Sequence, residues 1–267
     1  MFVLGTPIPI KFIHETLFDW VRCLGMKSVD TNENARLHFV YFSYRPDYEY
    51  LKLSIESLMN SIADKYIGSV HLFEDQKAPF SNEEISQLKK LCPNLVMQKV
   101  ENFSWASPES TLAEINCFAK VSEGGNRNDM VVKVDSDILF FKSDKLIRIL
   151  KSRLSNVGDG HNEHYRFAQG GLYLIRAWLI RDVLAKVTMD EIMQVVKKND
   201  SVGEDKTISR LLKERGHPFF LTRLMLYPSE YQRVVKLNAF NRWDFCSAHF
   251  VRDKDNMEQY QKRFSIT

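Results

Sequence analysis

The chain has 267 residues, 44% of them hydrophobic, and a formal net charge of only +3. A chain of this length and composition can bury a sizeable core, which excludes an intrinsically disordered protein. The pI of about 8.5 lies below the usual range of nucleic-acid-binding domains, so we expect no nucleic acid partner. No stretch approaches the 18 apolar residues of a membrane-spanning helix, and we expect a soluble or peripheral protein.

Four cysteines are spread along the chain without a Cys-x-x-Cys pair: Cys23, Cys92, Cys117 and Cys246. This spacing argues against a zinc cage or a disulfide framework and favours a reducing compartment. We therefore expect a cytoplasmic protein.

Basic residues concentrate near the C-terminus, where residues 206–267 hold 12 Lys and Arg against 6 Asp and Glu. This segment is either an ordinary solvated surface or a patch that faces anionic lipid or a phosphate-bearing acceptor. Residues 1–36 form a separate amphipathic extension whose apolar stripe packs on the protein itself or contacts a membrane or a partner. The stripe consists of Phe12, Ile13, Leu17, Trp20, Val21 and Leu24. Peripheral contact with the inner face of a membrane is thus one expectation.

From residue 37 onward, short apolar strands alternate with amphipathic helices, which predicts an α/β fold with a mostly parallel sheet. Ser81 and Glu84 form a capping box at the start of one helix, and Gly216 is a plausible cap at the end of another. A Gly/His/Asn-rich loop is expected over 155–166. The expected strands are 37–44, 69–73, 95–100, 130–134 and 171–176, and the expected helices are 48–62, 81–91, 108–121, 146–154 and 203–215, with further helices up to about 198.

Asp135 and Asp137 follow the strand 130–134 directly and are the most informative residues of the sequence. Ligands of open α/β sheets bind beyond the carboxyl ends of the strands, and two carboxylates there suit Mg²⁺ or Mn²⁺. A strand-end turn capped by aspartate is the alternative. A second Asp-x-Asp, at Asp253 and Asp255, has no strand before it, and we interpret it as a solvated surface turn.

With the Asp135-Ser136-Asp137 motif in mid-chain after three strand–helix units, the sequence resembles glycosyltransferases of the GT-A fold over roughly residues 37–250. Three later features resemble the same family: Gln169-Gly170-Gly171, the acidic pair Glu204-Asp205 at a helix start, and His249. The resemblance implies a GT-A-like, Rossmann-like mixed sheet flanked by helices. It also implies one catalytic domain over 37–267, with a nucleotide-binding half at 37–137 and an acceptor-binding half at 138–267.

The resemblance further implies a metal-dependent transfer of a hexose from a nucleotide sugar, expected to be a UDP-sugar, to a glycan or lipid-linked glycan. Asp135, Asp137 and His249 would hold Mn²⁺ or Mg²⁺, which neutralises the diphosphate leaving group. An imidazole ligand favours manganese.

The donor-binding residues that the resemblance implies surround this motif. Asp75 would accept a hydrogen bond from a uracil N–H, Lys120 would counter the diphosphate or pair with Asp135, and the two glycines would let the backbone approach the sugar. For Asp75 an ordinary turn acid, and for Lys120 a solvated lysine, are the alternatives. The full set is Ser43, Tyr44, Arg45, Asp75, Lys120, Asp135, Ser136, Gln169, Gly170 and Gly171.

Asp205, with Glu204 beside it, is the candidate general base, a role that implies inversion at the anomeric carbon. If Asp205 only orients donor hydroxyls, the enzyme is retaining, and 167–171 also resembles retaining enzymes such as glycogenin. Helix capping is the alternative role of both acids.

Two other functions stay open on the sequence. A phosphatase of the haloacid dehalogenase type also uses Asp-x-Asp, but there the motif ends the first strand rather than about the fourth. A non-catalytic nucleotide- or sugar-binding module is the other. His161 and His164 lack a third ligand at zinc-site spacing, and Trp105 and Trp243 either stack on sugars or pack in the core.

Overall fold

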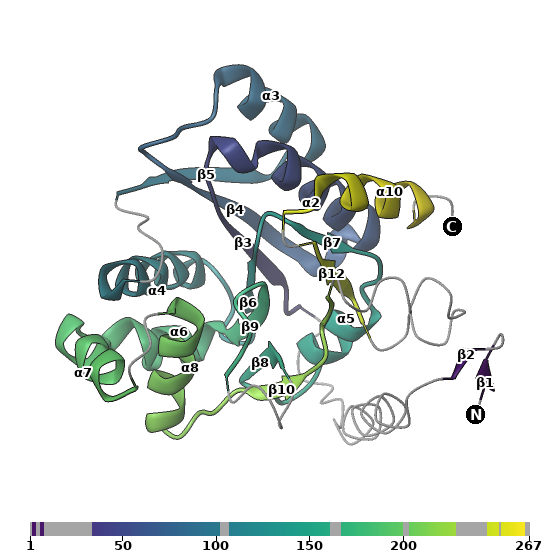
Figure 1. Ribbon diagram of the computed structural model, residues 1–267. Helices are drawn as coiled ribbons and strands as arrows, with labels where there is room; N and C mark the ends of the chain where they lie inside the picture. The colour runs from purple at the N-terminus through teal and green to yellow at the C-terminus, as the bar shows by residue number, and fades with distance from the viewer. Residues whose placement is uncertain are drawn as a thin grey trace.

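A seven-stranded sheet in the order β10-β8-β9-β6-β3-β4-β5 forms the centre of the computed structural model (Figure 1). The structure describes residues 2–3, 6–7, 34–101, 107–160, 167–199, 203–227, 245–250 and 252–264. The strands are β3 (Leu37–Ser43), β4 (Ile67–Asp75), β5 (Leu95–Val100), β6 (Met130–Val134), β8 (Asn156–Asp159), β9 (Leu172–Arg176) and β10 (Phe220–Thr222).

The sheet is mixed but mostly parallel, which confirms the predicted fold class. Strands β6, β3, β4 and β5 are parallel neighbours, and β10 is parallel to β8. Strand β9 runs antiparallel to both β6 and β8. Because β6 enters beside β3 on the side away from β4, the carboxyl ends of β3 and β6 flank the point where the strand order reverses, where ligands of α/β sheets bind.

A second sheet of three short strands, in the order β11-β12-β7, stands beside the first. It consists of β7 (Ile138–Phe140), β11 (Met225–Leu226) and β12 (Ser247–His249). Strand β12 pairs antiparallel with β7, so His249 lies opposite Ile138. Two further strands, β1 (Phe2–Val3) and β2 (Thr6–Pro7), pair with each other near the N-terminus.

Helices cover both faces of the central sheet (Figure 1). Helices α4, α6, α7 and α8 gather on one side, and α2, α5 and the small sheet on the other. None of the described helices is long and apolar enough to cross a membrane. The helices are α2 (Tyr48–Ser61), α3 (Asn82–Leu91), α4 (Pro108–Glu123), α5 (Asp144–Leu150), α6 (Ala177–Asp182), α7 (Met189–Asn199), α8 (Glu204–Glu214) and α10 (Lys254–Phe264).

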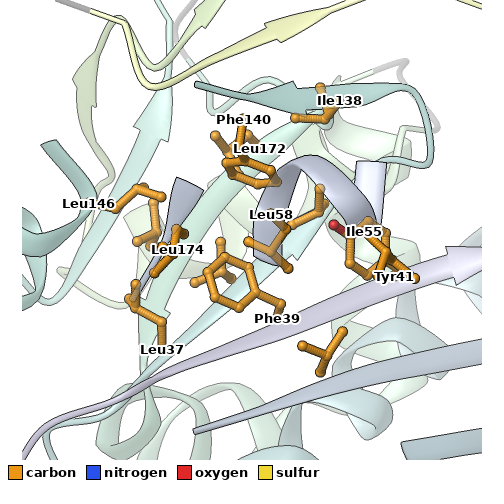
Figure 2. Close-up of a cluster of buried hydrophobic side chains, with 14 of the residues drawn as sticks. Leu37, Phe39, Tyr41, Ile55, Leu58, Ile138, Phe140, Leu146, Leu172 and Leu174 are labelled. Atoms are coloured by element: carbon orange, nitrogen blue, oxygen red, sulfur yellow. The ribbon is translucent and has the colours of Figure 1, made fainter. Parts of the chain in front are cut away.

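The alternation of side chains along β3 explains why two cores form. Phe39 and Tyr41 point into the cluster under α2, whereas Val40 and Phe42 belong to the cluster under α4. Figure 2 shows the first cluster, in which β3, α2, β7, α5 and β9 all contribute side chains. Burial of each large apolar side chain contributes about 1.5–3 kcal/mol, so a strand that is apolar on both faces is fixed at the centre of the sheet.

Local capping signals were confirmed. Ser81 caps α3, with hydrogen bonds in both directions between Ser81 and Glu84. Helix α8 ends in a Schellman motif, because the amide of Gly216 donates to the carbonyl of Lys213 and the amide of His217 to that of Leu212. Gly216 has a φ of +81°, which glycine adopts without strain.

Two predicted segments differ in the structure. The loop expected over 155–166 begins with the buried strand β8, whose Gly158 lies so close to Ala168 that a Cβ would come within 2.2 Å of the Ala168 Cβ. The turn expected at Asp253 and Asp255 instead opens α10, and the Asp253 carboxylate accepts from the amide of Asn256 at 3.2 Å. In the first segment a turn-forming glycine is used for close packing against Ala168. In the second, a turn-forming aspartate caps a helix.

Several residues singled out in the sequence lie outside the described residues. They are the apolar stripe between Phe12 and Leu24, together with Trp105, His161, His164 and Trp243.

Candidate active site

The Asp135-Ser136-Asp137 segment forms a tight turn between β6 and β7. The amide of Asp135 donates to the carbonyl of Gly171 at 3.0 Å, and the amide of Ile138 donates to the carbonyl of Asp135 at 3.3 Å. Ser136 donates its hydroxyl to Ser43 Oγ at 2.9 Å. These bonds hold the turn at the joint carboxyl ends of β3 and β6.

His249 reaches this turn because β12 pairs with β7. Its Nε2 lies 3.2 Å from Asp137 Oδ1, and the amide of Arg252 donates to Asp137 Oδ2 at 2.8 Å. One ligand atom from each of Asp135, Asp137 and His249 lies within 4.8 Å of the others. Residues separated by more than a hundred positions in sequence therefore form one cluster of metal-ligand type.

The electrostatics of this cluster favour a charged pair. Burial acts to raise the pKa of Asp137, but hydrogen bonds from His249 and from the Arg252 amide hold that pKa below its usual value. Burial acts to lower the pKa of His249, but the hydrogen bond and charge of Asp137, followed by the charge of Asp135, raise it. The imidazole is thus held in a strongly negative field.

Two carboxylates and an imidazole are a donor set that fits a divalent cation. Gly171 makes room for this set, since a Cβ there would lie 3.3 Å from His249 Nδ1 and 3.0 Å from Met225 Sδ. The residues present therefore fit a divalent metal ion, because their ligand atoms converge and Gly171 beside them has no side chain to fill the space.

A cavity opens beside the cluster, between the end of the central sheet and helices α4 and α8. A neighbouring hollow shares Phe42, Tyr44 and Asp135 with it and is also lined by Asp137, His249 and Arg252. The cavity itself is lined by Phe42, Ser43, Tyr44, Asp75, Glu114, Lys133, Asp135, Gly170, Tyr173, Glu204 and Asp205. The Asp-Asp-His cluster thus lies where the two hollows meet.

Lys133, rather than Lys120, is the lysine beside Asp135. Its ammonium donates to the Asp135 carboxylate and to the carbonyl of Gly170, and its side chain is only 11% exposed. Lys120 is exposed on α4, ten residues and about 15 Å along the helix from Ser110, which does reach the site. The structure does not bring Lys120 to the cavity. A lone lysine within the apolar run 131–134 was the sequence signal for Lys133.

Two further acids approach the cavity from helices. Glu114 on α4 is 3% exposed and accepts from the Tyr173 hydroxyl. Burial raises the pKa of Glu114 to about 7, against the opposing effects of Lys133 and the Tyr173 hydrogen bond. The first turn of α8 supplies Glu204, whose Oε1 accepts from Ser110 Oγ at 2.8 Å. Sequence analysis missed Glu114, although an acid on the apolar face of a helix is a signal for a buried polar role.

Asp205 is also on the first turn of α8. Its Oδ2 accepts from the amide of Gly170 at 3.0 Å, and its Oδ1 accepts from the amide of Lys206 at 2.7 Å. Burial raises the pKa of Asp205, and the charge of Glu204 adds to this rise, while the Lys206 amide and the charge of Lys133 oppose it. Gly170 therefore connects Asp205 on one side to Lys133 on the other.

Of the four residues expected beside the donor's base, the structure places three at the cavity and one outside it. Ser43, Tyr44 and Asp75 line the cavity, and Asp75 Oδ1 accepts from the amide of Lys77 at 2.8 Å. Arg45 is exposed and pairs with Glu84 at 3.3 Å outside the cavity.

The segment before β9 contributes only part of its residues to the cavity. Gln169 donates its backbone amide to the carbonyl of Asp159 and does not line the cavity, whereas Gly170 does.

Arg252 is a site residue that sequence analysis did not identify. Its φ of +62° lies in the left-handed region, which is rare for arginine. Its guanidinium donates to the Tyr44 hydroxyl at 3.1 Å and lies 3.5 Å from Asp47 Oδ2. This conformation lets the backbone amide of Arg252 donate to Asp137, and that hydrogen bond offsets the backbone strain at Arg252.

No model of a known protein family matches the chain, and no curated protein matches its sequence. Solved structures do match. A galactosyltransferase, LgtC, in complex with donor and acceptor sugar analogues, superimposes with a TM-score of 0.55 at 14% identity, covering 85% of this chain and 95% of LgtC.

Two larger enzymes match with similar scores. The glycosyltransferase GlyE of Streptococcus pneumoniae has a TM-score of 0.53 at 10% identity, covering 85% of this chain and 60% of GlyE. The bifunctional glycosyltransferase WbbM has a TM-score of 0.55 at 12% identity, covering 88% of this chain and 51% of WbbM. At these identities the likeness shows the fold, and the chain has the GT-A fold of these glycosyltransferases.

Proposed function

We propose that the chain is a metal-dependent glycosyltransferase that moves a hexose from a UDP-sugar to a glycan or lipid-linked glycan. The observation that carries this proposal is the convergence of Asp135, Asp137 and His249 at the mouth of a cavity rich in carboxylates. The cavity lies at the carboxyl ends of β3, β4 and β6, and the fold is that of known sugar-transferring enzymes.

Asp135, Asp137 and His249 would hold the divalent cation, with Mn²⁺ favoured over Mg²⁺ by the imidazole. When bound, the cation supplies neutralising charge for a diphosphate leaving group. The uracil base would lie between Ser43, Tyr44 and Asp75, where the Asp75 carboxylate can accept from its N–H. Gly170 would allow the sugar to approach the backbone closely.

Asp205 would act as general base, because its partly buried carboxylate lines the cavity and its raised pKa makes it a better proton acceptor. The acceptor hydroxyl bonds to the anomeric carbon as its proton passes to Asp205. The bond between the anomeric carbon and the diphosphate oxygen breaks, and UDP leaves. This direct displacement inverts the anomeric configuration.

An assay of UDP release from UDP-glucose and UDP-galactose in the presence of Mn²⁺ tests the activity. We expect Asp205→Asn to lower turnover by at least a hundredfold while UDP still binds, because the base is lost but the nucleotide contacts stay. Asp190→Asn is the matched control, since Asp190 is an exposed acid on the first turn of α7. NMR of the new anomeric centre distinguishes inversion from retention, and a retained configuration would contradict the role of Asp205 as base.

The proposed acceptor, a lipid-linked glycan, is inferred from the distribution of charged and apolar residues along the chain. The basic excess of residues 206–267 and the apolar stripe of residues 1–36 suit a lipid-linked acceptor at an anionic membrane surface. We expect the full chain to sediment with vesicles containing anionic lipid and a chain lacking residues 1–30 to sediment less. Equal activity of both chains, with no vesicle binding by either, would contradict a membrane-associated acceptor.

A further inference from the structure

The part of the cavity between Asp135 and helix α8 has an unbalanced charge. Four acids line it, namely Glu114, Asp135, Glu204 and Asp205, and Lys133 is the single cation among the described residues that line the cavity. Even with Glu114 protonated and Asp135 assigned to the cation, two carboxylates, Glu204 and Asp205, face one ammonium group. This region belongs to the same cavity as Ser43, Tyr44 and Asp75, and it contains Gly170, beside which the proposed function places the donor's sugar.

Lys133 is already committed to other groups. Its ammonium donates to the Asp135 carboxylate and to the Gly170 carbonyl, and its side chain is only 11% exposed. A ligand carboxylate would have to compete with both of these acceptors for the Lys133 ammonium. Lys133 is therefore a poor receptor for a negatively charged sugar.

The Asp205 carboxylate retains capacity to accept hydrogen bonds. It takes one amide on each of its two oxygens. An ionised carboxylate offers about four acceptor sites, so further donors fit. The hydroxyls of a neutral sugar supply such donors. The carboxylate of a uronic acid has no proton to donate and is repelled by the like charge of the cavity.

We propose that this pocket selects a donor with an uncharged sugar and discriminates against a uronic acid. The inference rests on the proposed function, since it assigns the sugar of the same donor. It concerns one chemical difference, the replacement of the sugar's CH₂OH group by a carboxylate.

Calorimetric titration of the wild-type chain, with Mn²⁺ present, separates this inference from the proposed function. UDP alone reports the nucleotide and metal site. UDP-glucose against UDP-glucuronic acid, and UDP-galactose against UDP-galacturonic acid, are pairs that differ only at C6. We expect each uronic acid donor to bind at least tenfold more weakly than its neutral partner.

A charge variant tests the cause of the selectivity. Glu204→Gln keeps an acceptor oxygen for Ser110 but removes a negative charge. It should therefore reduce the gap, the ratio of the two dissociation constants within each donor pair, at least threefold. Glu109→Gln removes a carboxylate from the exposed surface of the neighbouring helix α4 and should leave the gap unchanged.

The outcomes are distinct. UDP binding with equal or tighter binding of the uronic acid donors would overturn the selectivity while leaving the proposed function intact. An unchanged gap in Glu204→Gln would refute the charge of the pocket as its cause. Absence of UDP binding would overturn the proposed function and this inference together.

Discussion

At the residue scale, Lys133 interacts with three acids that line the cavity, Asp135, Glu114 and Asp205. It is held by Asp135 and by the Gly170 carbonyl, and the charges of Asp135, Glu114 and Asp205 raise its pKa against the opposing effect of burial. Removal of this one cation leaves several acids facing each other in a region of low dielectric. Its contribution to stability should therefore be large and separable from that of surface lysines.

We expect Lys133→Met to lower the free energy of unfolding by about 2–4 kcal/mol, because a buried ion pair loses one partner while Asp135 remains partly hydrated. Urea denaturation at pH 7 measures this change. Lys120→Met, on the exposed surface of α4, should change stability by less than about 0.5 kcal/mol. Equal losses of unfolding free energy in the two variants would show that the ion pair of Lys133 with Asp135 does not contribute to stability.

The pH dependence of turnover tests the role of Asp205. Its pKa is raised mainly by burial, and it must be ionised to accept a proton, so kcat/KM should fall on acidification through a pKa above the usual aspartate value of about 4. A pH profile of UDP release measures this limb. Glu114→Gln should leave the limb in place, because Glu114 is not the group that accepts the proton. Disappearance of the limb in Glu114→Gln would transfer the assignment to Glu114.

The sequence located the cluster more successfully than its surroundings. Asp135 and Asp137 follow an apolar strand, and His249 completes the pattern of the resemblance, so these residues could be found without coordinates. Lys133 and Glu114 carried weaker signals, a charged residue in an apolar run and an acid on an apolar helix face, and neither signal tells that the side chain turns toward the cavity. Arg252 could not be found either, since its left-handed backbone conformation and the bond of its amide to Asp137 arise only in the folded chain.

At the scale of elements, short polar segments were the hardest to predict. Strand β8 contains Asn156, Gly158 and Asp159, which are turn formers, yet it is buried between β9 and β10. Asp159 explains part of this, because its buried carboxylate accepts from the amides of Leu224 and Met225 and from the Tyr227 hydroxyl. Tertiary hydrogen bonds override local propensity there, whereas α3 and α8 carry their caps in the sequence.

The cap of α8 offers a clean test of backbone conformation. We expect Gly216→Ala to destabilise the protein by about 1–2 kcal/mol, because an alanine is forced into the left-handed region. Gly124→Ala is the matched control, since a Cβ at either position meets no atom within 4 Å and Gly124 has a φ of −84°. Thermal unfolding of both variants measures the difference. A similar loss of stability in both variants would mean that the positive φ of Gly216 does not account for the destabilisation.

At the scale of the whole molecule, the central sheet contains strands from both predicted halves of the chain. The site residues are therefore brought together by the order of the strands and helices in the fold, and not by one continuous segment of sequence. The mostly parallel character of this sheet could be anticipated from the alternation of strands and helices. The small sheet that delivers His249 could not, because β7, β11 and β12 have only two or three residues each. Strands this short leave no periodic signal.

Acid stability is another property of the whole fold. His71 on β4 has its pKa lowered to about 4, mainly by burial and also by the charge of His38. The unfolded chain therefore binds the proton more readily, and stability that is complete above about pH 6.5 should be lost progressively as pH falls toward 4. Urea midpoints at pH 7.5, 6 and 5 measure this slope. His71→Asn should flatten it, and an unchanged slope would exclude His71 as its source.

The most direct test of the proposed function is calorimetric titration of the full chain with UDP, with and without Mn²⁺. The account predicts that UDP binds in a Mn²⁺-dependent manner, that Asp137→Asn abolishes the dependence, and that Asp255→Asn, in the exposed second Asp-x-Asp, preserves it. Failure of UDP and GDP to bind under any condition would contradict a nucleotide-sugar enzyme and favour a phosphatase or a non-catalytic module.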